Sequence, residues 1–176
     1  MNTTPLELEN IYDLAYKALS AHGCDHFNAD SVATTVSHAE RDGSVSHGLF
    51  RIPGYVASLK SKKANGVSRP SNTYLTQNAI RVEGDYGFAP VGIKVGLPEL
   101  IKTTNKHGVG VLTITNTHHF AALWHETEAL AENNLVGIAC TAYKPSVAPA
   151  GAKKPLFGTN PISFAWPRKN NTPVVY

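Results

Sequence analysis

The sequence predicts a mixed fold in which a helical N-terminal region precedes a region of strands and helices. Up to about residue 65, apolar residues recur roughly every three or four positions, which is the spacing of amphipathic helices. After residue 79, short runs rich in β-branched residues are separated by further helical segments, as in α/β proteins. The predicted domains are therefore a helical region over residues 1–70 and a strand-containing region over residues 71–176.

The N-terminal region is expected to form three helices. Pro5 suits the first turn of a helix, where its missing N–H is not needed, and Gly23 is a typical helix end. Asn28 or Asp30 is a plausible N-cap for the second helix. The polar stretch from 60 to 70 contains Gly and Pro and predicts a linker. The expected helices cover residues 5–22, 28–42 and 46–60.

The second region is expected to alternate between strands and helices. Residues 109–115 mix β-branched and small side chains, which predicts a buried strand, and the Pro-rich stretch 144–160 predicts a loop. The chain stops inside its last expected strand, so we expect it to be part of a longer protein. The expected strands cover residues 79–83, 109–115, 135–141, 162–166 and 174–176, with helices over 91–106 and 120–134.

The composition indicates a folded protein that does not bind nucleic acid or a membrane. The chain has 176 residues, and its formal net charge of +3 is spread along the sequence, whereas nucleic-acid binders concentrate positive charge on one face. Hydrophobic residues make up 42% of the chain, which is enough for a genuine core. No apolar run approaches the roughly 18–20 residues that a membrane span needs.

The cysteines and the N-terminus predict a cytoplasmic location. Cys24 and Cys140 are far apart and fit no metal or redox spacing, which favours two thiols in a reducing cytosol. A disulfide between them is the less favoured alternative. The N-terminus is acidic and amphipathic, without a basic segment followed by an apolar one, so no signal peptide is predicted.

A Ser-His pair and an arginine form the first candidate site. Ser46 and His47 lie at an expected helix start, where a turn can expose side chains to a cleft. Arg51 follows His47 by four residues, on the same face of a regular helix. A His and an Arg in one pocket suit a substrate that carries a carboxylate near an atom needing a proton. The alternative is that Ser46 is only an N-cap and His47 an ordinary first-turn residue.

The second candidate is the segment 116–120, which contains His118 and His119 where a strand gives way to a helix. Such junctions bind ligands because the N–H groups at a helix N-terminus are free. A metal site would need a third ligand, which no nearby Cys, Asp or Glu clearly supplies, so no metal is expected.

The third candidate is the segment 155–161, which contains the tight-turn sequence Gly158-Thr159-Asn160-Pro161 and alternatively is only a loop entering a strand. The usual nucleotide-binding and hydrolase signatures are absent. No G-x-G-x-x-G follows a strand, and there is neither a G-x-x-x-x-G-K-[ST] nor a G-x-S-x-G motif. The residues alone therefore predict a cleft protein with a His/Arg pair that handles a small anion.

These three clusters, in this order, resemble the malate/L-lactate/sulfolactate dehydrogenase family, which are NAD(P)-dependent 2-oxoacid reductases without a Rossmann fold. The matching segments are RDGSVSHGLFRIPGYVASL, NTHHFAALW and GAKKPLFGTNPISFAWP. The combination of SHGLFRIPGY, HHFAALW and KPLFGTNP is most similar to the Δ1-piperideine-2-carboxylate/Δ1-pyrroline-2-carboxylate reductases. The resemblance implies an α+β fold, with a helical N-terminal region beside the first part of a non-Rossmann, cofactor-binding mixed sheet with helices.

The resemblance also implies roles for residues of all three segments. His47 would be the proton donor and Ser46 its relay partner, and Arg51 and Thr159 would contact the substrate. Hydride from NADPH or NADH would reach C2 of a cyclic imine or a 2-oxoacid, and His47 would supply the proton. The complete protein would be a cytoplasmic homodimer of amino-acid metabolism. The residues lining the cofactor site would be His119, Phe120, Ala121, Ala122 and Leu123.

Length separates this chain from the family that it resembles. Members continue past the position of Tyr176 with an acidic residue that completes the Ser/His relay and with most of the remaining cofactor contacts. We therefore expect the chain alone to be inactive and to bind NADPH weakly or not at all. Three functions stay open: a reductase of cyclic imine carboxylates, a malate- or L-lactate-type dehydrogenase, and a non-catalytic remnant that binds a partner.

Overall fold

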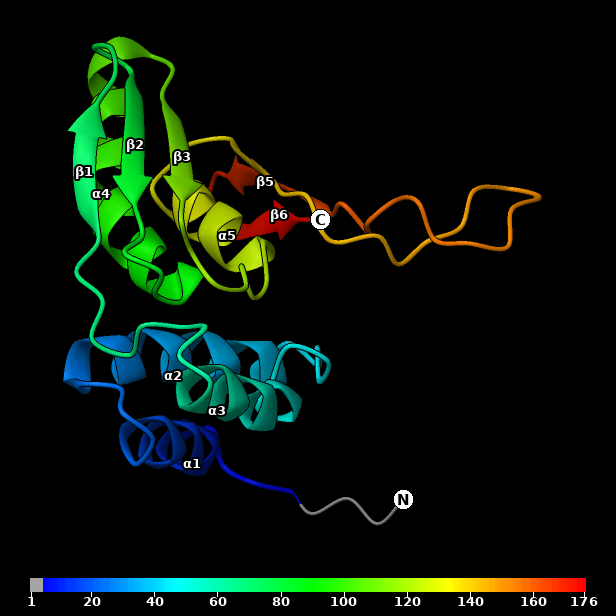
Figure 1. Cartoon of the computed structure of the whole chain (residues 1–176). Coiled ribbons are helices and arrows are strands. Elements are labelled where there is room, and N and C mark those ends of the chain that lie inside the picture. The colour runs from blue at the N-terminus through cyan, green and yellow to red at the C-terminus, as the bar shows by residue number, and fades with distance from the viewer. Residues whose placement is uncertain (1–4) are drawn as a thin grey trace. The chain divides into compact units, whose positions relative to one another are not determined.

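The computed structural model describes residues 5–176, which divide into two compact units with a boundary between Ala122 and Leu123. The first unit contains several helices and the second contains one, and each has a small three-stranded sheet, which confirms the expected α+β class (Figure 1). The first unit contains α1 (Leu8–Ser20), α2 (His26–Arg41), the 3-10 helix η1 (Leu49–Arg51), α3 (Ile52–Lys60), β1 (Ser71–Tyr74), β2 (Ala79–Glu83), α4 (Ala89–His107) and β3 (Val111–Thr115). The second contains α5 (Trp124–Glu132), β4 (Gly137–Cys140), β5 (Ile162–Arg168) and β6 (Asn171–Val175).

The first unit contains the expected helices, with two differences. The third helix does not begin after Ser46, because residues 45–48 form a turn and residues 49–51 a 3-10 helix before α3, and the N-cap of α2 also differs. The side chain of Asp25 caps this helix by accepting a hydrogen bond from the backbone N–H of Asn28 at 3.0 Å. Asn28 lies inside the helix and is fully buried, and its amide oxygen accepts from the Ser68 hydroxyl at 2.6 Å. The predicted caps at Asn28 and Asp30 are therefore wrong, because Asn28 is used for a buried tertiary contact.

Near residue 70 the secondary structure changes from helices to strands, and this change lies inside the first unit. β1 begins at Ser71, in line with the expected start of the strand-containing region. Phe88 and Val91, at the start of α4, belong to the same buried cluster as the helical residues Leu19 and Val32. The helices therefore share one core with the sheet region, and the compact units divide about 50 residues further along the chain than the expected boundary.

The first sheet has the order β1-β2-β3, with an antiparallel β1–β2 pair and a parallel β2–β3 pair. α4 is the connection between the two parallel strands, as the geometry of parallel pairing requires. A Cβ atom at Gly96 would lie 2.6 Å from the side chain of Val82, so a glycine at this position lets α4 pack closely on β2. β1 lies next to the stretch expected to be a linker, and its pairing with β2 was not foreseen from the sequence.

Burial in this sheet differs from the expectation for residues 109–115. The side chains of Ile80 and Val82 on the central strand β2 are fully buried. β3 is an edge strand with alternating exposed and partly buried residues, so the prediction of a buried strand there is wrong. β-branched composition indicates a strand but does not tell an edge strand from a central one.

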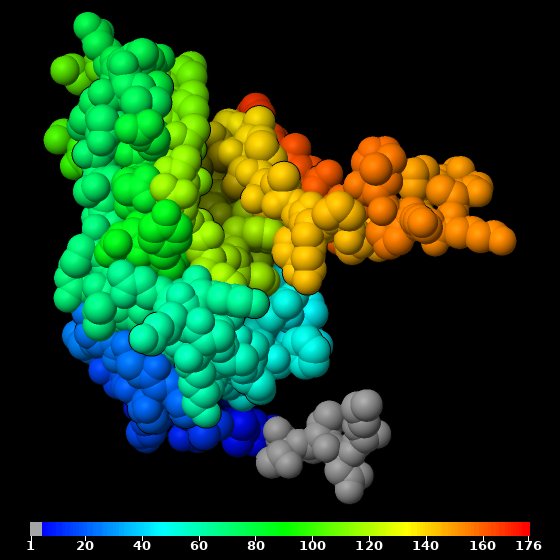
Figure 2. All heavy atoms as spheres, in the orientation of Figure 1, coloured from blue at the N-terminus to red at the C-terminus, as the bar shows by residue number. Residues whose placement is uncertain are grey.

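The second unit is an antiparallel sheet with the order β4-β5-β6 and one helix, α5. The Thr127 and Ser163 hydroxyls are 2.8 Å apart, and Ser163 donates to the carbonyl oxygen of Tyr176 at 2.9 Å, which joins α5 to two strands. The loop between β4 and β5, drawn in orange, projects away from the sheet of its own unit (Figures 1 and 2). This is the stretch predicted to be a loop.

Both cysteines are free: Cys24 is buried and Cys140 is exposed. In the part of the chain that the structure describes, none of the helices is both long and apolar enough to cross a membrane.

Candidate active site

The turn between α2 and η1 positions Ser46 and His47. The carboxylate of Glu40, near the end of α2, accepts the backbone N–H of Leu49 at 2.7 Å and so ties the far end of the turn back to the helix. A side chain at Gly48 would meet this carboxylate and would require the Glu40 side chain to move. The His47 N–H bonds to the Ser44 carbonyl oxygen at 2.8 Å. The sequence of the turn therefore holds the His47 backbone in one place.

Two hydroxyl groups contact the same ring nitrogen of His47. Its Nδ1 is 3.1 Å from the Ser46 Oγ and 3.2 Å from the Ser44 Oγ. Burial lowers the pKa of His47, and the nearby charge of Arg51 lowers it further, so the environment favours the neutral ring. The contact with Ser46 is the one that the resemblance implied. Ser44 was not singled out from the sequence, although it lies three residues before His47 in the quoted segment.

Arg51 is held against the same turn. Its Nε donates to the carbonyl oxygen of Ser46 at 2.6 Å. Arg51 is the last residue of the short 3-10 helix η1, so it reaches the turn through this contact and not by the regular helical spacing that the sequence suggested. Among residues 5–176 no acceptor contacts the two Nη groups of Arg51, which leaves them available to an anion.

The segment after β3 supplies the second group of predicted residues. His119 and Ala121 have positive φ angles of 52° and 58°, a conformation that costs free energy for residues other than glycine. Ala121 and Ala122 are buried, and the Phe120 ring stacks on the His119 ring with centroids 5.4 Å apart. These irregular angles explain why α5 begins at Trp124 and not at the expected residue 120.

The two groups of residues meet around His119. Burial lowers the pKa of His119 to about 4, and the charges of Arg51, His118 and His47 contribute to the same shift, which requires them to be close. The Tyr55 hydroxyl of α3 lies 3.1 Å from the His119 Nδ1. The structure thus brings together Ser46, His47, Arg51 and His119, and it adds Tyr55, which sequence reasoning missed. Its position four residues after Arg51 is the signal that could have indicated it.

The remaining predicted residues belong to the second unit. Leu123 is its first residue and is buried, and Thr159 is exposed in the long loop between β4 and β5. Their participation in the site around His47 stays a prediction.

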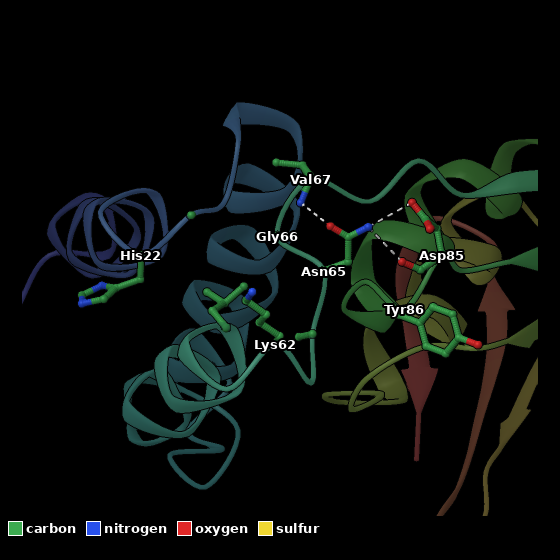
Figure 3. A pocket seen from close by; sticks show the side chains of 10 residues that line it. His22, Lys62, Asn65, Gly66, Val67, Asp85 and Tyr86 are labelled. Carbon is green, nitrogen blue, oxygen red and sulfur yellow. Dashed lines mark hydrogen bonds between the residues drawn. The ribbon is translucent and has the colours of Figure 1, made fainter.

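A separate depression of about 490 Å³ lies elsewhere in the first unit (Figure 3). Its wall is stabilised by Asn65, whose amide group donates to the backbone and side-chain oxygens of Asp85 at 3.2 and 3.1 Å, and whose oxygen accepts from the N–H of Val67 at 3.0 Å (Figure 3). Because the polar groups of Asn65 and Asp85 satisfy one another, and because no residue of the His47 cluster lines this depression, we assign it no function. Within residues 5–176 there is no group of three or more His, Cys, Asp or Glu side chains that could hold a metal ion.

Comparison with known proteins identifies the family. The family model for malate/L-lactate dehydrogenase matches residues 6–176. The chain belongs to this family. The resemblance inferred from the three motifs is therefore confirmed, and it extends over nearly the whole chain.

The relatives of this family member include the expected subgroup. The Δ1-pyrroline-2-carboxylate reductase 2 of Burkholderia multivorans is 38% identical over 171 residues, which cover 97% of this chain and 50% of that protein. The crystal structure of Δ1-piperideine-2-carboxylate reductase from Pseudomonas syringae pv. tomato gives a TM-score of 0.92 at 38% identity, over 99% of this chain and 52% of that one. A malate dehydrogenase from Entamoeba histolytica gives the same TM-score at 27% identity, over 99% and 49% of the two chains. This chain spans about half the length of these relatives.

Proposed function

We propose that this chain is the N-terminal half of a reductase that converts Δ1-pyrroline-2-carboxylate and Δ1-piperideine-2-carboxylate into the corresponding saturated cyclic amino acids. The observation that carries the proposal is the convergence of His47 and Arg51 on one cluster, an arrangement that would place a proton donor beside a carboxylate anchor. The names of the relatives at 35–41% identity support the same substrate class.

His47 is proposed to donate a proton to the imine nitrogen from its Nε2. A hydroxyl group can both donate and accept a hydrogen bond, so Ser46 and Ser44 can contact Nδ1 in either protonation state of the ring. They would hold the ring orientation while the proton leaves. Arg51 would bind the substrate carboxylate with its Nη groups, because a guanidinium matches a carboxylate with two parallel hydrogen bonds.

A nicotinamide cofactor is proposed to bind beside this site, where the buried alanines at 121 and 122 bring backbone close to any group bound there. When bound, the reduced cofactor supplies the hydride that reaches C2 of the imine. We propose NADPH over NADH, and we place His119, Phe120, Ala121, Ala122 and Leu123 at its site. We also propose that residues 71–176 are the first part of the cofactor-binding domain and that Thr159 faces the substrate. The complete protein is proposed to be a cytoplasmic homodimer.

A malate- or lactate-type activity is the second candidate, because the malate dehydrogenase from Entamoeba histolytica has the same fold over this half. The test is a steady-state comparison on the full-length protein. Both cyclic imines, oxaloacetate and pyruvate are each assayed with NADPH and with NADH. We expect kcat/KM to be highest for a cyclic imine with NADPH. Turnover of the 2-oxoacids alone would favour the second candidate, and no turnover of any substrate would favour the non-catalytic remnant.

A further inference from the structure

The His119 ring is held by two contacts on a single nitrogen. The backbone N–H of Ala121 donates to Nδ1 at 3.1 Å. The hydroxyl oxygen of Tyr55 lies 3.1 Å from the same atom. Both His119 and Ala121 have left-handed backbone angles, so this short segment keeps a conformation that costs free energy. Strain of this kind persists at functional sites where the surrounding structure enforces it.

The two contacts determine where the proton of His119 lies. A backbone N–H can only donate, so the Nδ1 that receives it carries a lone pair and no proton. The Tyr55 hydroxyl must then be the donor in the second contact. In a neutral imidazole with an unprotonated Nδ1, the proton is on Nε2. No acceptor among residues 5–176 contacts this second nitrogen.

Burial and ring packing hold the Tyr55 hydroxyl in this place. Its side chain is only 4% exposed, and its ring packs against Phe88 with centroids 4.9 Å apart. Burial raises the pKa of Tyr55 to about 12, so the hydroxyl keeps its proton and remains a donor. The Tyr55 and His119 rings meet edge to face at 5.5 Å, which restricts the rotation of the imidazole.

We propose that Tyr55 is a positioning residue that holds His119 as the neutral Nε2–H tautomer, and that this Nε2–H donates a hydrogen bond to an oxygen atom of the bound cofactor or of the substrate carboxylate. The inference rests on the proposed function, which supplies those two ligands. A neutral donor suits this position. The charged or titratable groups that face His119 are Arg51, His47, His118 and the Tyr55 hydroxyl, which stays neutral, and a second permanent positive charge among them would be repelled.

The test uses the full-length protein labelled with 15N in the histidine rings. The His119 signals are identified by their loss in His119→Gln, and NMR then reports which ring nitrogen carries the proton. We expect Nε2 to be protonated and Nδ1 unprotonated from pH 5 to 8. A proton on Nδ1 in this range would overturn the proposal.

Tyr55→Phe keeps the packed ring and removes only the hydroxyl. We expect the pKa of His119 to rise by about one unit, roughly the contribution of one hydrogen bond, while the N–H of Ala121 still keeps Nδ1 unprotonated. The matched control is Tyr12→Phe, which removes a hydroxyl that donates to Asp30 at 2.7 Å in the same unit. The control should leave the His119 signals unchanged. Equal effects of the two substitutions, or no effect of Tyr55→Phe, would refute a positioning role.

Ligand titration distinguishes the two sources of the oxygen acceptor. NADPH alone and pyrrole-2-carboxylate alone, a planar carboxylate analogue of the substrate, are added to the labelled protein. A shift of the Nε2–H proton signal with NADPH assigns the acceptor to the cofactor, and a shift with pyrrole-2-carboxylate assigns it to the substrate. A shift with neither ligand overturns the donor role. If the full-length protein shows no imine turnover in the assays above while His119 is found as the Nε2–H tautomer, the proposed function would be overturned and the positioning role of Tyr55 would not.

Discussion

Acidification should destabilise the first unit through His119. Burial lowers the pKa of this ring from its ordinary value of 6.5 to about 4, with smaller contributions from Arg51, His118 and His47. Between these pH values the unfolded chain binds a proton that the folded chain does not. The free energy of unfolding is therefore unaffected by this group above about pH 6.5, and it falls as the pH is lowered towards about 4.

The size of the effect follows from the shift in pKa. One unit corresponds to about 1.4 kcal/mol, so the whole shift is worth about 3 kcal/mol, of which about 2–3 kcal/mol has been lost at pH 4.5. This is a large fraction of the roughly 5–15 kcal/mol that stabilises an ordinary domain. His47 and His118 change stability in the same direction, because burial lowers the pKa of each. A comparison of variants is therefore needed to isolate His119.

The assay is urea unfolding at pH 7 and at pH 4.5, followed by far-ultraviolet circular dichroism. His119→Gln carries a side chain that does not titrate, so it should lose about 2–3 kcal/mol less than the wild type between the two pH values. His107→Gln, at the exposed end of α4, is the matched control and should behave like the wild type. If the wild type and His119→Gln lose the same free energy of unfolding on acidification, the environment assigned to His119 is wrong.

Three further predictions address catalysis, the core and the cofactor. In the full-length protein, His47→Ala should lower kcat by roughly 10²–10⁴ with little change in KM, whereas Arg51→Ala should first raise KM. An unchanged kcat per folded site for His47→Ala would contradict the proton-donor role. Asn28→Ala should lower the free energy of unfolding by about 2–4 kcal/mol in urea titrations, because it leaves the buried Ser68 hydroxyl without its acceptor. A loss below about 1 kcal/mol would contradict the structural role assigned to Asn28. The 176-residue chain alone should bind NADPH weakly or not at all by calorimetry, and micromolar binding would refute the expectation that most contacts lie outside it.

The regular elements were predictable because their signals are local. Apolar spacing located α1 and α4 to within a few residues, since each helix buries one face and the pattern repeats along it. One error occurred where a distant residue decides the outcome. Asn28 is a core residue because Ser68, 40 positions away, lies against it, and that partner cannot be read from the neighbouring sequence. β1 was missed although β2, its partner, follows it closely in the chain.

The sequence by itself determined the family and the chemical types of the site: a Ser-His pair, an arginine and a paired-histidine segment, in an order that identifies the malate/L-lactate dehydrogenases. Only the tertiary structure decided which of these residues meet and in what protonation state. Arg51 reaches the Ser46 carbonyl through a 3-10 turn, and Tyr55 contacts His119 from 64 positions away in the chain. The physical reason is that burial and neighbouring charges set a pKa, and a hydrogen-bond partner sets a tautomer. Both depend on which residues are close in space, which folding decides and local sequence does not.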